Sequence, residues 1–151
     1  MIRQGAKEDL QTLVEGNLQM AQETEGLALD RETVTRGVAA VLEGEAPGRY
    51  FVFEVEGRVQ GQLMVTFEWS DWRARQVWWI QSVYVWPEAR RGGVYRQLYQ
   101  AVQAAARADG AGGIRLYVDE RNTRAQEVYA RLGMNGEHYR VFEAMFEEPA
   151  S

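Results

Sequence analysis

The sequence of 151 residues contains no cysteine, one histidine, one lysine and three prolines. Without cysteine the chain forms no disulfide, and it has neither a thiolate nucleophile nor a cysteine ligand for a metal. The single histidine, His138, excludes a multi-histidine metal site and argues against a Ser-His-Asp triad. We therefore expect a protein without a metal centre.

Long apolar runs are also missing from the sequence. No run approaches the ~20 residues that a membrane-spanning helix needs. The N-terminal stretch MIRQGAKEDL lacks the apolar segment of a signal peptide, so we expect a cytoplasmic location. The net charge of −5 argues against general nucleic-acid binding, which depends on the neutralisation of phosphates by Lys and Arg.

The order of the secondary-structure patterns predicts an α/β (α+β) domain with a mixed sheet. With 46% hydrophobic and 26% charged residues, the chain can bury a core as one domain over residues 1–151. Helical spacing starts at Leu10, a loop is expected at residues 22–29, and Asp30 is the expected N-cap of a second helix. The other predicted elements are strands at 1–5, 49–57, 59–69, 76–86, 114–118 and 139–147 and helices at about 92–107 and 122–133.

The stretch VYVWPEARRGGVYRQLY, residues 83–99, passes from a strand through a proline, two arginines and two glycines into a helix. A helix N-terminus carries free N–H groups and about half a positive charge. Glycines before it let the backbone surround an anion, and Arg90 and Arg91 add charge and donors. The stretch therefore predicts a phosphate-binding loop, and the alternative is a tight turn with solvated arginines. It is neither a Walker loop nor a dinucleotide fingerprint.

Two motifs in the chain resemble the landmarks of the GNAT superfamily of acyl-CoA-dependent N-acyltransferases. The first, the pyrophosphate loop Arg/Gln-x-x-Gly-x-Gly/Ala, matches Arg90, Arg91, Gly92, Gly93, Val94 and Tyr95. The second, Asn-x-x-Ala-x-x-x-Tyr-x-x-x-Gly-Phe, matches Asn122, Ala125, Tyr129, Gly133 and Met134. The separation of the motifs and the element order also agree, so the resemblance covers essentially the full chain. It implies a single domain with a mixed central sheet of six to seven strands flanked by about four helices.

The resemblance also implies an activity, the transfer of an acetyl group from acetyl-CoA to a primary amine of a small molecule or peptide by direct attack. The strand end Val83, Tyr84 and Val85 would contact the cosubstrate, and the backbone N–H of Val83 would stabilise the oxyanion. Asn122 would hydrogen-bond the pantetheine arm, act as a helix N-cap, or do both. Tyr129 would protonate the leaving thiolate, whereas without the motif it would be interpreted as a core tyrosine.

Three positions depart from the family pattern. Tyr95 stands where Gly or Ala is usual, so its side chain either narrows the pyrophosphate site or turns away from it. Met134 replaces an aromatic residue and should affect only packing. Some family members carry a glutamate base at the position of Trp79, and the nearby Gln81 cannot replace it. The remaining base candidates are Glu68, the best of them, and Asp71, Glu23 and Glu25, each of which is otherwise a solvated carboxylate.

The five tryptophans of the chain all fall within residues 69–86. Trp78 and Trp79 are neighbours on a predicted strand and must face opposite sides of the sheet. One ring would lie in the core, and the other would line the acceptor cleft, where aromatic faces with nearby carboxylates suit a cationic amine. The alternative is that these rings fill the core or form a dimer contact.

Two other functions stay open. A non-catalytic acyl-CoA binding module would keep the loop without a base, although the retained Tyr129 and Asn122 oppose it. A nucleic-acid or ribosome-associated domain would bind its partner through arginines, and the candidates are Arg90, Arg91, Arg96 and Arg115. The net negative charge of the chain argues against this function. We expect acetyl-CoA and an amine as partners, without nucleic acid or membrane, and a possible homodimer by analogy with the family.

Overall fold

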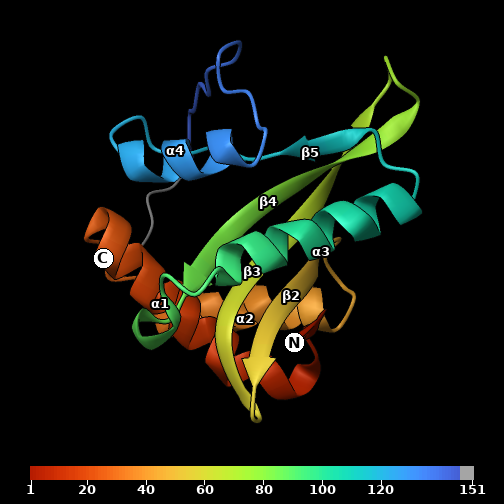
Figure 1. Ribbon diagram of the computed structural model, residues 1–151. Helices are drawn as coiled ribbons and strands as arrows, with labels where there is room; N and C mark the ends of the chain where they lie inside the picture. The colour runs from red at the N-terminus through yellow and green to blue at the C-terminus, as the bar shows by residue number, and fades with distance from the viewer. Residues whose placement is uncertain (147–151) are drawn as a thin grey trace. The chain divides into compact units, whose positions relative to one another are not determined.

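A mixed sheet forms the centre of residues Met1–Arg115, one of two compact units in the chain. The computed structural model describes residues 1–146. The strands lie in the order β1-β2-β3-β4-β5 (Figure 1), and all neighbours are antiparallel except the parallel pair β4 and β5. Their bounds are Ile2–Gln4, Arg49–Val55, Arg58–Ser70, Arg75–Val85 and Gly113–Arg115. The prediction of a mixed sheet is confirmed.

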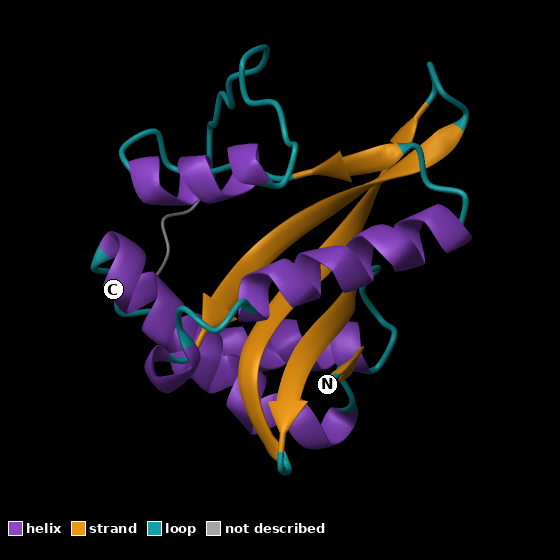
Figure 2. Ribbon diagram, viewed as in Figure 1, coloured by secondary structure: helices purple, strands orange, loops and turns teal. Residues whose placement is uncertain are grey.

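Two helices, α1 (Leu10–Glu25) and α2 (Arg31–Leu42), cover one face of this sheet (Figure 2). Leu13 of α1 and Val38 of α2 pack with Val52 of β2 in a buried apolar cluster. Asp30 caps α2 as expected, because its carboxylate accepts a hydrogen bond from the backbone N–H of Thr33 at 3.0 Å. The prediction of a loop at residues 22–29 was wrong for its first half. Helix α1 continues through residues 22–25 and ends only at Gly26, whose left-handed φ of 64° closes it.

The third helix, α3 (Val94–Ala108), covers the other face and lies close to β3 because Gly61 has no side chain. A Cβ atom at Gly61 would stand 2.5 Å from Cγ1 of Val94 and 3.3 Å from Cδ1 of Leu98. Leu63 and Val65 alternate with residues that face α1 and α2, lie on the same face of β3 as Gly61, and are fully buried. This close contact fixes the first turn of α3 beside β3.

The sheet has five strands within residues 1–146, so the expectation of six to seven strands was wrong for this part of the chain. Residues 139–146 form no strand and are exposed, while residue 147 lies outside the described residues. β5 ends at Arg115 instead of residue 118, and its ladder stops at the pair Trp79–Arg115. Aromatic and β-branched residues favour a strand only where a neighbouring strand completes the pairing, and these segments have no such neighbour within residues 1–146.

The second unit, Leu116–Glu148, contains the helix α4 (Thr123–Arg131). Two short 3-10 helices, Lys7–Asp9 and Pro87–Ala89, belong to the first unit. The expectation of about four α-helices is confirmed within residues 1–146, and the expectation of one domain over residues 1–151 stays a prediction. None of the helices within residues 1–146 combines the length and the apolar character that crossing a membrane requires.

Candidate active site

Strand β4 carries a bulge at the position where the sequence suggested an oxyanion donor. Two residues of β4, Ser82 and Val83, stand opposite the single residue Leu63 of β3. Ser82 adopts a left-handed φ of 55°. A bulge leaves its extra residue outside the ladder, and on the other side the β5 ladder ends at Trp79. Within residues 1–146, the backbone of Val83 therefore has no partner residue in either neighbouring strand.

The connection from β4 to α3 forms an open helix N-terminus. After the 3-10 helix Pro87–Ala89, Gly93 is the N-cap of α3, with a left-handed φ of 75° that favours glycine. Within residues 1–146 no side chain caps this helix, so its first N–H groups are open to a ligand from this part of the chain. A Cβ atom at Gly93 would meet no heavy atom within 4 Å, so the space beside it is open. This arrangement suits an anion.

Arg90, which we expected at the phosphate, is held by groups of its own unit. Its Nε donates to the carbonyl of Val85 at 2.9 Å, and its Nη2 donates to both carboxylate oxygens of Glu23 at 3.0 and 3.1 Å. Its guanidinium carbon stands 5.5 Å from the centre of the Tyr84 ring. The sequence did not reveal this role of Glu23, because 67 positions separate it from Arg90 and the helix around it was expected to be a loop.

Tyr84 is a buried residue that packs beside this ion pair. Its hydroxyl donates to Oε1 of Gln19 at 2.9 Å, and its ring meets that of Trp86 edge to face at 5.2 Å. Burial, followed by the Glu23 carboxylate, raises the pKa of Tyr84 to about 12. The Tyr84 hydroxyl, followed by the Arg90 guanidinium, holds the pKa of Glu23 below its usual range. A carboxylate with a lowered pKa accepts a proton less readily, so Glu23 is a poor general base.

Arg91 and Tyr95 complete the loop. Arg91 has a left-handed φ of 70° and is exposed, and no hydrogen bond or ion pair within residues 1–146 engages its guanidinium. The ring of Tyr95, in the first turn of α3, lies 6.4 Å from the ring of Tyr99 one turn later. This contact directs the Tyr95 side chain along α3, which favours the expectation that it turns away from the glycines of the loop.

The structure does not bring Glu68, the preferred base candidate, close to Val83. The Glu68 carboxylate is exposed and accepts a hydrogen bond from Nη1 of Arg115 at 2.9 Å. Glu68 pairs with Val77, six positions before Val83 on β4, which corresponds to roughly 20 Å along the strand. The other candidates, Asp71 and Glu25, are also exposed.

Trp78 and Trp79 face opposite sides of the sheet, as the alternation of the strand predicted. Trp78 is fully buried and meets Phe67 edge to face at 5.2 Å. Trp79 is half-buried and pairs with Thr66 of β3 and with Arg115 of β5. Directly paired residues share a face of the sheet, so Trp79 lies on the face where Arg115 meets Glu68. Trp79 is therefore the ring of this pair that keeps some exposure to solvent.

In the second unit, Asn122 and Tyr129 lie at the start and near the end of α4. Oδ1 of Asn122 accepts a hydrogen bond from the backbone N–H of Ala125 at 3.1 Å, so Asn122 is the N-cap. This leaves the amide nitrogen of Asn122 for a ligand. Tyr129 is half-buried, and burial raises its pKa above the ordinary value.

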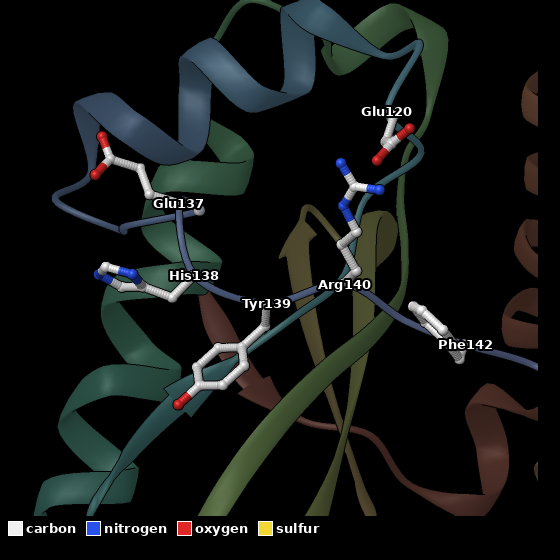
Figure 3. Close-up of a pocket in the computed structure, with 7 residues that line it drawn as sticks. Glu120, Glu137, His138, Tyr139, Arg140 and Phe142 are labelled. Carbon is white, nitrogen blue, oxygen red and sulfur yellow. The ribbon is translucent and has the colours of Figure 1, made fainter.

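The second unit also contains a hollow of about 550 Å³, lined by residues 136–140 with Glu120 and Phe142 (Figure 3). Glu120 and Arg140 point toward one another at one side of it. All of its lining residues are exposed, and none is a predicted site residue. The lining of the hollow therefore does not overlap with the residues expected to bind acyl-CoA.

Comparisons with known proteins agree with the arrangement of β4, the loop and α3. The model of the acetyltransferase (GNAT) family matches residues 13–134. A possible acetyltransferase from Clostridium difficile 630 is 38% identical, with a TM-score of 0.90 over 98% of each chain. Thialysine N-epsilon-acetyltransferase of Bos taurus is 30% identical over 87 residues, which are 54% of this chain and about half, 51%, of that protein. A predicted acetyltransferase from Clostridium acetobutylicum, solved with acetyl-CoA, shares the fold at 14% identity, with a TM-score of 0.76 over 95% of each chain. The chain belongs to the acetyltransferase (GNAT) family.

Proposed function

We propose that this protein transfers an acetyl group from acetyl-CoA to a primary amine of a small molecule or peptide. One observation carries the proposal. Within Met1–Arg115, the uncapped N-terminus of α3 and the bulge at Val83 lie at the two ends of one connection. A pyrophosphate and a thioester carbonyl can therefore meet donors of the same unit. The acetyl-CoA in the structure of the Clostridium acetobutylicum relative supports this choice of cosubstrate.

The loop suits a diphosphate in charge and in shape. The first N–H groups of α3 have no side-chain cap, and the helix dipole favours an anion at this end. Gly93 leaves open space beside the backbone, and the exposed Arg91 adds a positive charge. The nucleotide part of acetyl-CoA would be held here, with Val83, Tyr84 and Val85 along the pantetheine and Asn122 donating to it.

The chemistry follows from the thioester. A neutral amine attacks the carbonyl carbon, the new C–N bond forms, and the C–S bond breaks. The backbone N–H of Val83 would stabilise the oxyanion, and the bulge, which leaves Val83 without a paired residue on β3, supports this role. The CoA thiolate would take its proton from Tyr129, an assignment that rests on the family motif. The amine passes its own proton to water, and from there either to solvent or to Glu68.

Glu68 is the candidate for the general base. Glu68 accepts from Arg115 and lies roughly 20 Å from Val83 along the sheet, so it would act only through a chain of waters. Glu68→Gln tests this role by the pH dependence of turnover. An unaltered pH–rate profile would remove Glu68 from the mechanism and leave water as the proton acceptor.

The acceptor is proposed from two observations. The bovine relative is named for the acetylation of an amine, the N-epsilon group of thialysine. In this chain, Trp79 is half-buried on the face of the sheet where Glu68 pairs with Arg115, and an aromatic face favours a cation. We therefore expect cationic amines to be better acceptors than anionic ones.

Release of free thiol from acetyl-CoA tests the proposed function directly. The chain has no cysteine, so every thiol in the assay comes from CoA. We expect release that requires both acetyl-CoA and an amine, in a panel that contains thialysine, lysine, polyamines, peptides and anionic amines. Acetyl-CoA binding without turnover on any amine would support the binding-module alternative. The nucleic-acid alternative is disfavoured, because two of its four arginines, Arg90 and Arg115, are engaged by carboxylates.

A further inference from the structure

We propose that Glu23 of α1 is a positioning residue for the cosubstrate loop and that it acts through Arg90. The inference rests on the proposed binding of acetyl-CoA by this loop. Arg90 would serve as the anchor of the loop, and Arg91 would supply the cation that meets the pyrophosphate. The two adjacent arginines therefore have different roles, although their sequence context makes them look equivalent.

The contacts of Arg90 orient its side chain and also pair its positive charge with a carboxylate. Nη2 contacts both oxygens of Glu23, and Nε contacts the carbonyl of Val85, so the planar guanidinium is held at two of its corners. The ring of Tyr84 covers one of its faces. A lysine ammonium lacks this planar fork and cannot reproduce the set.

The residues behind Arg90 make a rigid support. Tyr84 is buried, donates to Gln19 of α1 and packs on Trp86. Glu23 lies one helical turn after Gln19, so the same side of α1 contacts both Tyr84 and Arg90. The last turn of α1 also favours a cation, because the negative end of the helix dipole lies there.

The fixed position of Arg90 accounts for the backbone conformation of Arg91. Arg90 is extended, with ψ of 151°, and Arg91 reverses direction with a φ of 70°. A side chain that is drawn toward α1 at Arg90 leaves the chain to turn at Arg91 before Gly93 starts α3. Arg91 therefore stays exposed at the mouth of the helix N-terminus, while Glu23 neutralises Arg90.

The test compares Glu23→Gln with Glu32→Gln, a matched control at an exposed glutamate in the first turn of α2. Acetyl-CoA affinity is measured by calorimetry, and KM and kcat are measured with an active amine. We expect Glu23→Gln to raise the Kd and the KM for acetyl-CoA about five- to tenfold and to keep kcat within twofold. Glu32→Gln should change none of these values.

Variants of Arg90 separate positioning from charge. If Glu23 acts through Arg90, then Glu23→Gln has no further effect in an Arg90→Ala background. Arg90→Lys should weaken binding as much as Arg90→Ala, because the charge is kept and the fork is lost. Normal affinity in Arg90→Lys, additive effects in the double variant, or unchanged or tighter binding by Glu23→Gln would each overturn the inference.

Two controls keep the outcomes distinct. Thermal melts without ligand verify that each variant is folded, as expected for side chains that are 45% and 40% exposed. A wild-type protein that does not bind acetyl-CoA would remove the proposed function together with this inference. Wild-type binding with an unaffected Glu23→Gln variant would remove this inference alone. A fall in kcat with an altered pH profile would instead make Glu23 a base.

Discussion

At the scale of single residues, two non-glycine residues with positive φ mark the candidate site. Ser82 and Arg91 both adopt left-handed conformations, at φ of 55° and 70°. Such a conformation costs an ordinary residue about 1–2 kcal/mol, and it persists only where surrounding contacts hold it. Ser82 takes part in the bulge that leaves Val83 unpaired, and Arg91 turns the chain into α3. The backbone strain therefore coincides with the two groups of N–H donors that the proposed chemistry needs.

Tyr129→Phe tests the proposed general acid. A well-placed acid contributes a factor of about 100 or more to turnover, so we expect kcat to fall by about that factor. The Kd for acetyl-CoA should stay within twofold, because only the hydroxyl is removed.

The pH dependence of the wild-type protein gives the matching control. An acid must be protonated to act, so turnover is lost as the pH rises through its pKa. Burial raises the pKa of Tyr129, so the corresponding alkaline limb should lie above the ordinary value of about 10 and should be missing in Tyr129→Phe. Full turnover by that variant would show that another group protonates the thiolate.

At the scale of elements, the seating of α3 on β3 positions the loop. Val94, the first residue of α3, packs where Gly61 leaves room, so the N-terminus of the helix is held beside the end of β4. On the other face, α1 contacts the same region through Gln19 and Glu23. The loop therefore lies between two helices that pack on opposite faces of one sheet.

Gly61→Ala should displace α3. The new Cβ would stand 2.5 Å from Val94, and overpacking of this kind costs about 1–3 kcal/mol. We expect that loss of stability in chemical denaturation, together with weaker binding of acetyl-CoA. Gly37→Ala is the matched control, because a Cβ there meets nothing within 4 Å and Gly37 lies within α2. Its substitution should be neutral or stabilising by up to about 1 kcal/mol. Equal stability of both variants would contradict a close contact at Gly61.

Local patterns in the sequence predicted those elements whose formation depends on residues close together in the chain. The β2–β3 hairpin, the passage from β4 into α3 and the cap of α4 by Asn122 all follow from alternation, glycine and capping residues. The bulge escaped prediction, because no glycine or proline marks Ser82. The anchor of Arg90 escaped because it depends on a contact across 67 positions. The segment expected as a strand at 139–147 contains strand-forming residues. Its described part, residues 139–146, has no neighbouring strand within residues 1–146 to pair with.

At the scale of the whole molecule, the family model spans residues 13–134 and so includes parts of both compact units. The net charge of −5 is compatible with a site for an anionic cosubstrate, because the positive groups are concentrated locally at Arg91 and the start of α3. A cytoplasmic location and a homodimer stay predictions.

The most direct test of the proposed cosubstrate site is a thermal melt with acetyl-CoA at about a hundred times its Kd. Binding at that ratio adds roughly 2.7 kcal/mol, and about 2–4 °C per kcal/mol for a chain of this size gives a rise of roughly 5–10 °C. Acetyl-pantetheine, which has the thioester but no pyrophosphate, should give no comparable rise at the same concentration. No rise with acetyl-CoA in a folded protein, or an equal rise with acetyl-pantetheine, would show that residues 90–95 do not hold a pyrophosphate.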